Sequence, residues 1–195
     1  MPLVLARDRS SGVLRCFVVA VLVAFALLMR FSPPVEAGFA ARASGGGCGA
    51  HKAYDRANPF ARAVLCLQNR HRRAHGLRPL RASRSLRRAA VVHARDMARR
   101  NYFGHVSPGH RTVVDRVGRT GYSRRFTAGE NIFFARPGSS PAQAVAAWMA
   151  SPGHRHQILS RGWEEVGIGT IMGSPSSAPG GVTVVAVFGS RGARR

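Results

Sequence analysis

Three polar residues are the first candidates for chemistry in this sequence: His105, Glu130 and His154. Each lies in a short stretch interrupted by Gly, Ser or Pro, namely YFGHVSPG, TAGENIFF and SPGHRHQIL. Imidazole and carboxylate groups carry much of acid–base catalysis and are common metal ligands. Their spacing matches no standard catalytic motif, because the chain contains no HExxH, GxSxG or CxxC pattern.

Spacing alone therefore leaves a structural role open for all three residues. Glu130 could cap a loop, and each histidine could bond to nearby backbone. The pentapeptide SPGHR occurs twice, at 107–111 and 151–155, but the flanking residues share no apolar pattern. The repetition therefore does not indicate a repeated structural unit.

Two long helices are predicted in the first half of the chain. The first begins at Asn58-Pro59, carries one apolar stripe and ends near Gly76. The second begins after Ser83, and the face expected to be buried carries Leu86, Ala90, His93 and Met97. Its opposite face is predicted to be a solvated arginine surface, formed by Arg84, Arg88, Arg95 and Arg99. On this pattern His93 is expected to be a core histidine rather than a ligand.

The second half mixes short helices with strands. A short helix is expected at 112–119, and another from Ser140-Pro141 until Pro152-Gly153, with RHQIL as a separate helical turn. Three segments rich in β-branched residues are predicted to be strands: ENIFFAR, EEVGIGTIMG and GVTVVAVFGS. Helices flanking a small antiparallel sheet give a sandwich of the α+β class.

The N-terminus has the pattern of a secretory signal. A basic segment precedes the apolar run 16–29, and Val35-Glu36-Ala37 offers small residues for cleavage. We expect a signal peptide at 1–37, a flexible Gly/Ala-rich arm at 38–56 and one domain at 57–191. The predicted location is therefore extracellular. The alternative is a membrane anchor formed by an uncleaved N-terminal segment.

Basic residues greatly outnumber acidic ones. Lys and Arg total 30 against 8 Asp and Glu, which gives a net charge of +22, and Lys52 is the only lysine. A genome rich in arginine codons would explain this bias. The functional explanation is attraction to an anionic polymer or lipid headgroups. Nucleic acid is the least expected of these partners for an exported protein.

Cleavage at the predicted site would leave two cysteines, Cys48 and Cys66. In an oxidising compartment such a pair is expected to form a disulfide. The alternative is that Cys66 is a small buried hydrophobic residue on the first helix.

Several fragments, in one order along about Phe60–Ser190, resemble the CAP superfamily, also called the SCP family, in its bacterial secreted branch. The fragments are LQNRHRRAHGLRPL, AAVVHARDMARRNYFGHVSP, Asp115-Arg116, GENI, WMASPGHRHQIL, EVGIG and the final VFG. The resemblance implies an α-β-α sandwich of the CAP/SCP type whose cleft gathers His105, Glu130 and His154. In this assignment His110, within the first SPGHR copy, has no role.

The chain departs from the family pattern at one site position. Ser151 stands where animal and plant members carry a second Glu, so only one acid remains in the predicted cleft. Two imidazoles and a carboxylate are a reasonable ligand set for zinc or another divalent metal. The resemblance makes metal binding by His105, Glu130 and His154 plausible, while the missing acid weakens a metal-hydrolase interpretation.

Three functions follow as hypotheses. The first is a secreted, non-enzymatic module that binds an extracellular or cell-envelope ligand through the His/Glu/His cleft. The second is a metal-dependent hydrolase of peptide or envelope polymer, which requires a metal held in that cleft. The third is a basic adhesion protein for anionic polymer, in which the cleft is vestigial.

Overall fold

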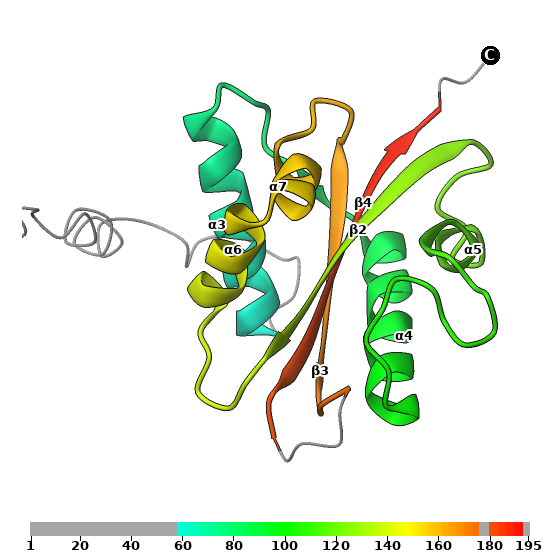
Figure 1. Cartoon of the computed structure of the whole chain (residues 1–195). Coiled ribbons are helices and arrows are strands. Elements are labelled where there is room, and N and C mark those ends of the chain that lie inside the picture. Colours follow the sequence, from blue (N-terminus) through cyan, green and yellow to red (C-terminus); the bar gives the residue numbers. More distant parts are fainter. Residues whose placement is uncertain (1–57, 176–179, 193–195) are drawn as a thin grey trace, which may run out of the picture. The chain divides into compact units, whose positions relative to one another are not determined.

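A four-stranded sheet lies between two layers of helices (Figure 1). The computed structural model describes residues 58–175 and 180–192. The helices are α3 (Pro59–Ala74), α4 (Arg84–Arg100), α5 (Val113–Gly118), α6 (Pro141–Ala150) and α7 (Pro152–Leu159). The strands are β1 (Arg81–Ala82), β2 (Phe126–Ala135), β3 (Glu165–Met172) and β4 (Val182–Arg191). Helices α3, α6 and α7 cover one face of the sheet, and α4 and α5 cover the other (Figure 1). The predicted α-β-α sandwich is confirmed.

The sheet is mixed rather than wholly antiparallel. Its strand order is β1-β3-β4-β2, and β4 pairs antiparallel with both β2 and β3. The edge strand β1 pairs parallel with β3 and was not predicted from the sequence. A two-residue strand has no periodicity to recognise, because its backbone pairing depends on where the chain between α3 and α4 crosses the sheet.

The helices begin where the capping residues predict. The Asn58 side chain accepts a hydrogen bond from the Ala61 N–H, and Pro59 occupies the first helical turn. Ser83 caps α4 in the same way. Thr112 and Ser140 each form a capping box with the residue three positions later. The segment RHQIL is part of α7, which begins at Pro152, directly after the end of α6.

Each face of the sheet has its own apolar core. Trp148, Ile158 and Phe188 lie in the core beneath α3, α6 and α7. Leu86 and Met97 of α4 lie in the core on the other face. Because side chains alternate along a strand, β2 sends consecutive residues into the two layers. Strand β2 also lies at an edge of the sheet, where α5 contacts it from one layer and α6 and α7 contact it from the other.

Helix α4 lies directly against β3 because of two glycines in EVGIG. A Cβ at Gly167 would lie 2.0 Å from the Arg87 backbone nitrogen, and one at Gly169 would lie 2.4 Å from that of Val91. No side chain fits in either place. The glycines therefore set the position of α4 and of the residues it carries toward β2.

The predicted signal peptide (1–37), arm (38–56) and Cys48 lie outside the described residues. Cys66 is disulfide-bonded, and its pairing with Cys48 stays a prediction. Within the described part of the chain, no helix is long and apolar enough to cross a membrane.

Candidate functional site

Glu130 is the centre of a cluster of charged and titratable groups. It lies in the middle of β2, opposite Val187 of β4, and its side chain is only 2% exposed. Its Oε1 atom lies 3.0 Å from Nδ1 of His105 and 3.5 Å from Nε2 of His93. Its Oε2 atom accepts a hydrogen bond of 3.0 Å from Nη2 of Arg116. Both carboxylate oxygens are therefore engaged within the protein.

His105 lies in the segment between α4 and α5 and is the accessible member of the cluster. Its side chain is 53% exposed, and Nδ1 is the ring nitrogen turned toward Glu130. Among the described residues, Nε2 of His105 has no hydrogen-bond partner. The cluster thus presents one imidazole edge to ligand while the carboxylate behind it stays buried.

Arg116 joins the segment 105–111 to Glu130. Its buried guanidinium donates to the backbone oxygens of His105 and Arg111, each at 2.9 Å, as well as to Glu130. Helix α5 supplies this side chain, and the capping box at Thr112 fixes where that helix begins. Arg116 therefore positions both the carboxylate and the histidine that faces it.

His93 is buried, as the helix periodicity predicts, but it also belongs to the cluster. Its Nε2 atom lies 3.0 Å from the Gly104 backbone oxygen, so Nε2 carries the proton of the neutral ring. Burial lowers the pKa of His93, and the nearby negative charge of Glu130 only partly opposes this. The helix periodicity predicts that His93 is buried, but it cannot predict that the Glu130 carboxylate of β2 lies beside the ring.

A second polar group extends the cluster from His93. The Tyr102 hydroxyl lies 3.4 Å from Nδ1 of His93 and donates a hydrogen bond of 2.6 Å to Asp96. Ser107 lies 3.1 Å from the same hydroxyl. Burial raises the pKa of Tyr102, and the bond to Asp96 acts in the same direction. None of these three residues was singled out from the sequence.

His154 approaches the cluster from the opposite helical layer. Its backbone oxygen accepts a hydrogen bond of 3.0 Å from Nδ2 of Asn131, the residue next to Glu130 in β2. Burial lowers the pKa of His154, and the positive charge of His105 lowers it further. Within the described residues, no hydrogen bond or ion pair joins the His154 side chain to Glu130 or His105, so His154 belongs to the site through its backbone contact with β2.

Ser151, the fourth predicted cleft residue, lies at the junction of α6 and α7. Its backbone N–H donates to the oxygens of Ala147 and Trp148, and its side chain makes no capping hydrogen bond. Within the described part of the chain, no side-chain hydrogen bond joins Ser151 to Glu130.

The described residues give no direct support for a zinc site built from His105, Glu130 and His154. They contain no group of three or more His, Cys, Asp or Glu side chains placed to hold a metal ion. One oxygen of Glu130 is already bonded to the Arg116 guanidinium, which competes with a metal for that oxygen. Zinc binding by these three residues stays a prediction.

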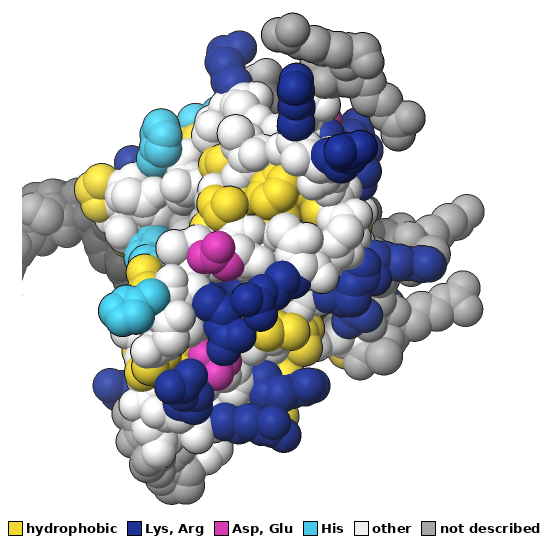
Figure 2. Space-filling model, turned by 90° about the vertical axis from the view of Figure 1, so that its right-hand side faces the viewer, with side chains coloured by type: hydrophobic (Ala, Val, Ile, Leu, Met, Phe, Trp, Pro, Cys, Tyr) yellow, Lys and Arg dark blue, Asp and Glu magenta, His cyan; other side chains and the backbone are white. Residues whose placement is uncertain are grey.

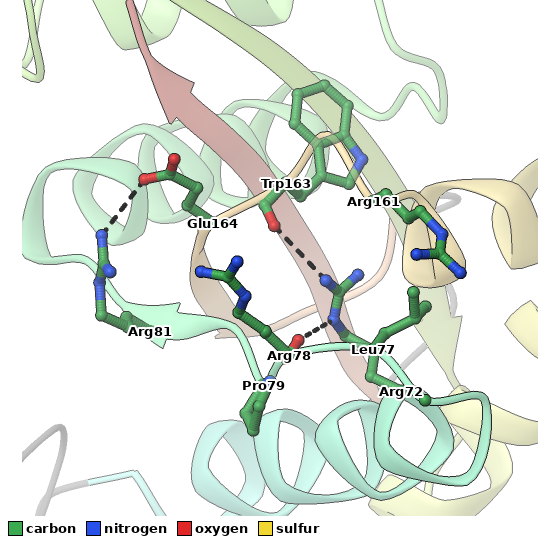
Figure 3. A pocket seen from close by; sticks show the side chains of 9 residues that line it. Arg72, Leu77, Arg78, Pro79, Arg81, Arg161, Trp163 and Glu164 are labelled. Carbon is green, nitrogen blue, oxygen red and sulfur yellow. Dashed lines mark hydrogen bonds and ion pairs between the residues drawn. The ribbon is translucent and has the colours of Figure 1, made fainter. Parts of the chain in front are cut away.

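A cavity of about 400 Å³ lies elsewhere, beside the C-terminal end of α3 (Figure 3). Arg72 lies in its wall, is 2% exposed, and donates to the backbone oxygens of Arg78, Ile158 and Ser160 at 2.8–2.9 Å. These bonds hold the end of α7 and the segment after α3 together. None of the predicted site residues lines this cavity.

The comparisons with known proteins agree with this architecture. Residues 65–188 match the family model CAP, described as the cysteine-rich secretory protein family. The uncharacterized protein YkwD of Bacillus subtilis is 37% identical over 112 residues, which cover 57% of this chain and 42% of that protein. The uncharacterized membrane protein YlbC of the same organism is 36% identical over 106 residues, 54% of this chain and 30% of that protein. The matches thus span less than half the length of these curated relatives.

Two solved structures share the fold. An extracellular protein containing a SCP domain from Bacillus anthracis aligns with a TM-score of 0.55 and 29% identity over 66% of this chain and 39% of its own. An outer surface protein of Borrelia burgdorferi aligns with a TM-score of 0.56 over 68% of this chain and 93% of its own. At 19% identity, the second match supports the fold alone.

Proposed function

Because this chain belongs to the CAP family of cysteine-rich secretory proteins, we propose that it is a non-enzymatic ligand-binding module outside the cytoplasm. Its ligand is an extracellular or cell-envelope molecule, which contacts His154 and the exposed ring of His105, while the buried Glu130 holds that ring in place. The N-terminal signal pattern supports export, and so does the similarity to an extracellular SCP-domain protein.

The engagement of Glu130 is the observation that carries this proposal. A general base must offer a free lone pair to the proton it removes. Here one carboxylate oxygen is bonded to Arg116 and the other faces two histidines. Glu130 instead orients His105, whose exposed ring edge is free to form a hydrogen bond with a ligand. This combination favours recognition over hydrolysis.

The chain offers matched controls for a binding test. His110 and His156 are exposed histidines near His105 and His154 in sequence, and within the described residues neither side chain forms a hydrogen bond or ion pair with Glu130 or His105. We would measure retention of the purified protein on cell-envelope material at fixed salt. The set would contain His105→Ala, His154→Ala, His110→Ala and His156→Ala, each checked for an unchanged Tm.

The proposal predicts weaker retention of the first two variants and normal retention of the two controls. Each of these two variants loses one hydrogen-bonding group from the ligand site, which should weaken binding by about tenfold. If all four variants are retained as well as the parent protein, the cluster is not the binding site.

A further inference from the structure

An arginine-lined groove runs between α4 and α5, on the face of the molecule that carries dense basic side chains in Figure 2. Its volume is about 460 Å³. One wall is a stripe of α4 with Arg88, Arg95 and Arg99 around Val92, and the other carries Arg111 and Arg119. The groove shares Arg116 with the Glu130 cluster, and Asp96 and Ser107 with the polar group that extends the cluster, but its lining includes neither His105 nor Glu130.

The stripe on α4 follows helical geometry. Positions 88, 92, 95 and 99 are separated by four, three and four residues, so their side chains form one row. At 1.5 Å per residue this row is about 16 Å long. Val92 is 56% exposed within it. At one end, Arg88 donates a hydrogen bond of 2.8 Å to the Thr120 backbone oxygen, which joins the two walls. The groove is therefore long enough for several units of a polymer.

Most of the positive charge in the groove is not neutralised. Arg116 pairs with Glu130. Asp96, the only acidic residue in the lining, lies 3.8 Å from Arg100 and accepts from Tyr102. Within residues 58–175 and 180–192, Arg95, Arg99 and Arg111 form no ion pair. Arg95 and Arg99 are four residues apart on one helix, where like charges repel. A bound anion would remove this repulsion.

The lining distinguishes among anionic ligands. A phosphate group projects its oxygens in several directions and can accept from guanidinium groups on both walls, whereas the two oxygens of a carboxylate match a single guanidinium. Proteins that bind single-stranded nucleic acid combine basic groups with aromatic side chains on which the bases stack. The groove lining contains no aromatic residue.

We propose that this groove binds an anionic polymer whose charges are phosphate groups and which is not a nucleic acid. Arg95 and Arg99 contact the polymer from α4, Arg111 contacts it from the opposite wall, and Val92 packs against the links between phosphates. This site is separate from the His105 contact surface proposed above, so either one can fail without the other.

The test uses labelled short-chain inorganic polyphosphate and the full-length protein, with Kd measured by fluorescence anisotropy at one fixed salt concentration. The groove variant is Arg95→Gln with Arg99→Gln. The control variant is Arg73→Gln with Arg136→Gln, which removes the same charge from exposed positions outside the groove. Polyglutamate and single-stranded DNA of similar charge serve as competitors.

The proposal predicts a Kd at least about tenfold weaker for the groove variant, because charge-assisted contacts are lost. The control variant should change by less than about twofold, because distant charges are screened. Equal losses in the two variants would show attraction to net charge alone and overturn the site. Competition by polyglutamate or DNA as strong as that by unlabelled polyphosphate would overturn the phosphate assignment.

Discussion

Two buried arginines, one on each face of the sheet, show how the two helical layers differ. Arg72 of α3 and Arg116 of α5 are 2% and 5% exposed. Among residues 58–175 and 180–192, the partners of the Arg72 guanidinium are all backbone oxygens, those of Arg78, Ile158, Ser160 and Trp163. The Arg116 guanidinium bonds to two backbone oxygens, the Ser107 hydroxyl and the Glu130 carboxylate.

The difference separates a structural role from a functional one. Burial lowers the pKa of Arg72, and within the described residues no acidic group is placed to pair with it. Its bonds simply fix where α3 and α7 end. Arg116 is instead connected through Glu130 to the buried His93 and to His105, whose side chain is exposed. Of the two buried arginines, only Arg116 therefore contacts, within the described residues, a carboxylate that also holds an accessible side chain.

The largest effect is expected from Arg116→Met. This change leaves the Glu130 carboxylate buried without its cation, which costs about 3–5 kcal/mol of unfolding free energy. The loss should shrink as the pH falls, because protonation of Glu130 removes the unpaired charge. Urea unfolding at several pH values measures both quantities. The exposed neighbour Arg119→Met serves as control, with a change within about 0.5 kcal/mol.

A somewhat smaller effect, about 2–4 kcal/mol, is expected from Arg72→Met. It leaves at least three backbone oxygens without their donor but creates no unpaired charge. The loss should be the same at neutral and mildly acidic pH. A loss that varies with pH as in Arg116→Met would remove the distinction between the two layers. Arg73→Met, next to it and exposed, is the matched control.

The smallest effect concerns His93 and its pH dependence. Burial lowers its pKa from 6.5, so the unfolded chain takes up a proton at a higher pH than the folded protein does. The stabilisation from neutral His93 is therefore complete above about pH 6.5 and is lost as the pH falls below it. The slope is at most about 1.4 kcal/mol per pH unit.

Replacing His93 by Gln should flatten this part of the stability curve. His71 and His154, whose pKa values are also lowered by burial, remain in the variant, so the difference isolates His93. Unfolding free energies at about pH 7.5 and about pH 5.5 give the comparison. An unchanged slope would mean that His93 does not couple the α4 layer to pH.

Much of the fold could be predicted from local pattern. The helix caps at Asn58, Ser83 and Ser140 and the runs of β-branched residues can be recognised within short stretches of sequence. Strand β1 could not be predicted in this way, because its pairing is decided by tertiary contacts. The same limit applies to Gly167, whose close approach to α4 depends on a helix far away in the sequence.

The candidate site was only partly predictable. The family resemblance predicts that His105 and Glu130 share a cleft, and the structure places them 3.0 Å apart. Arg116 belongs to an Asp-Arg pattern in the sequence, but nothing local indicates that its side chain bonds to Glu130. The helical position of His93 predicts a place in the core, whereas its contact with the carboxylate depends on which face of β2 lies against α4. A buried polar cluster is formed by contacts between residues far apart in the sequence, and local sequence patterns do not reveal such contacts.

The central claim is that Glu130 is engaged by Arg116 and two histidines, and the proposed role of the cluster is therefore recognition and not metal binding. Zinc titration by calorimetry on the chelator-stripped protein tests it most directly, with His105→Ala and His154→Ala alongside. The account predicts no micromolar zinc binding that depends on both histidines. One zinc per chain, bound at micromolar or tighter affinity and lost in both variants, would contradict it.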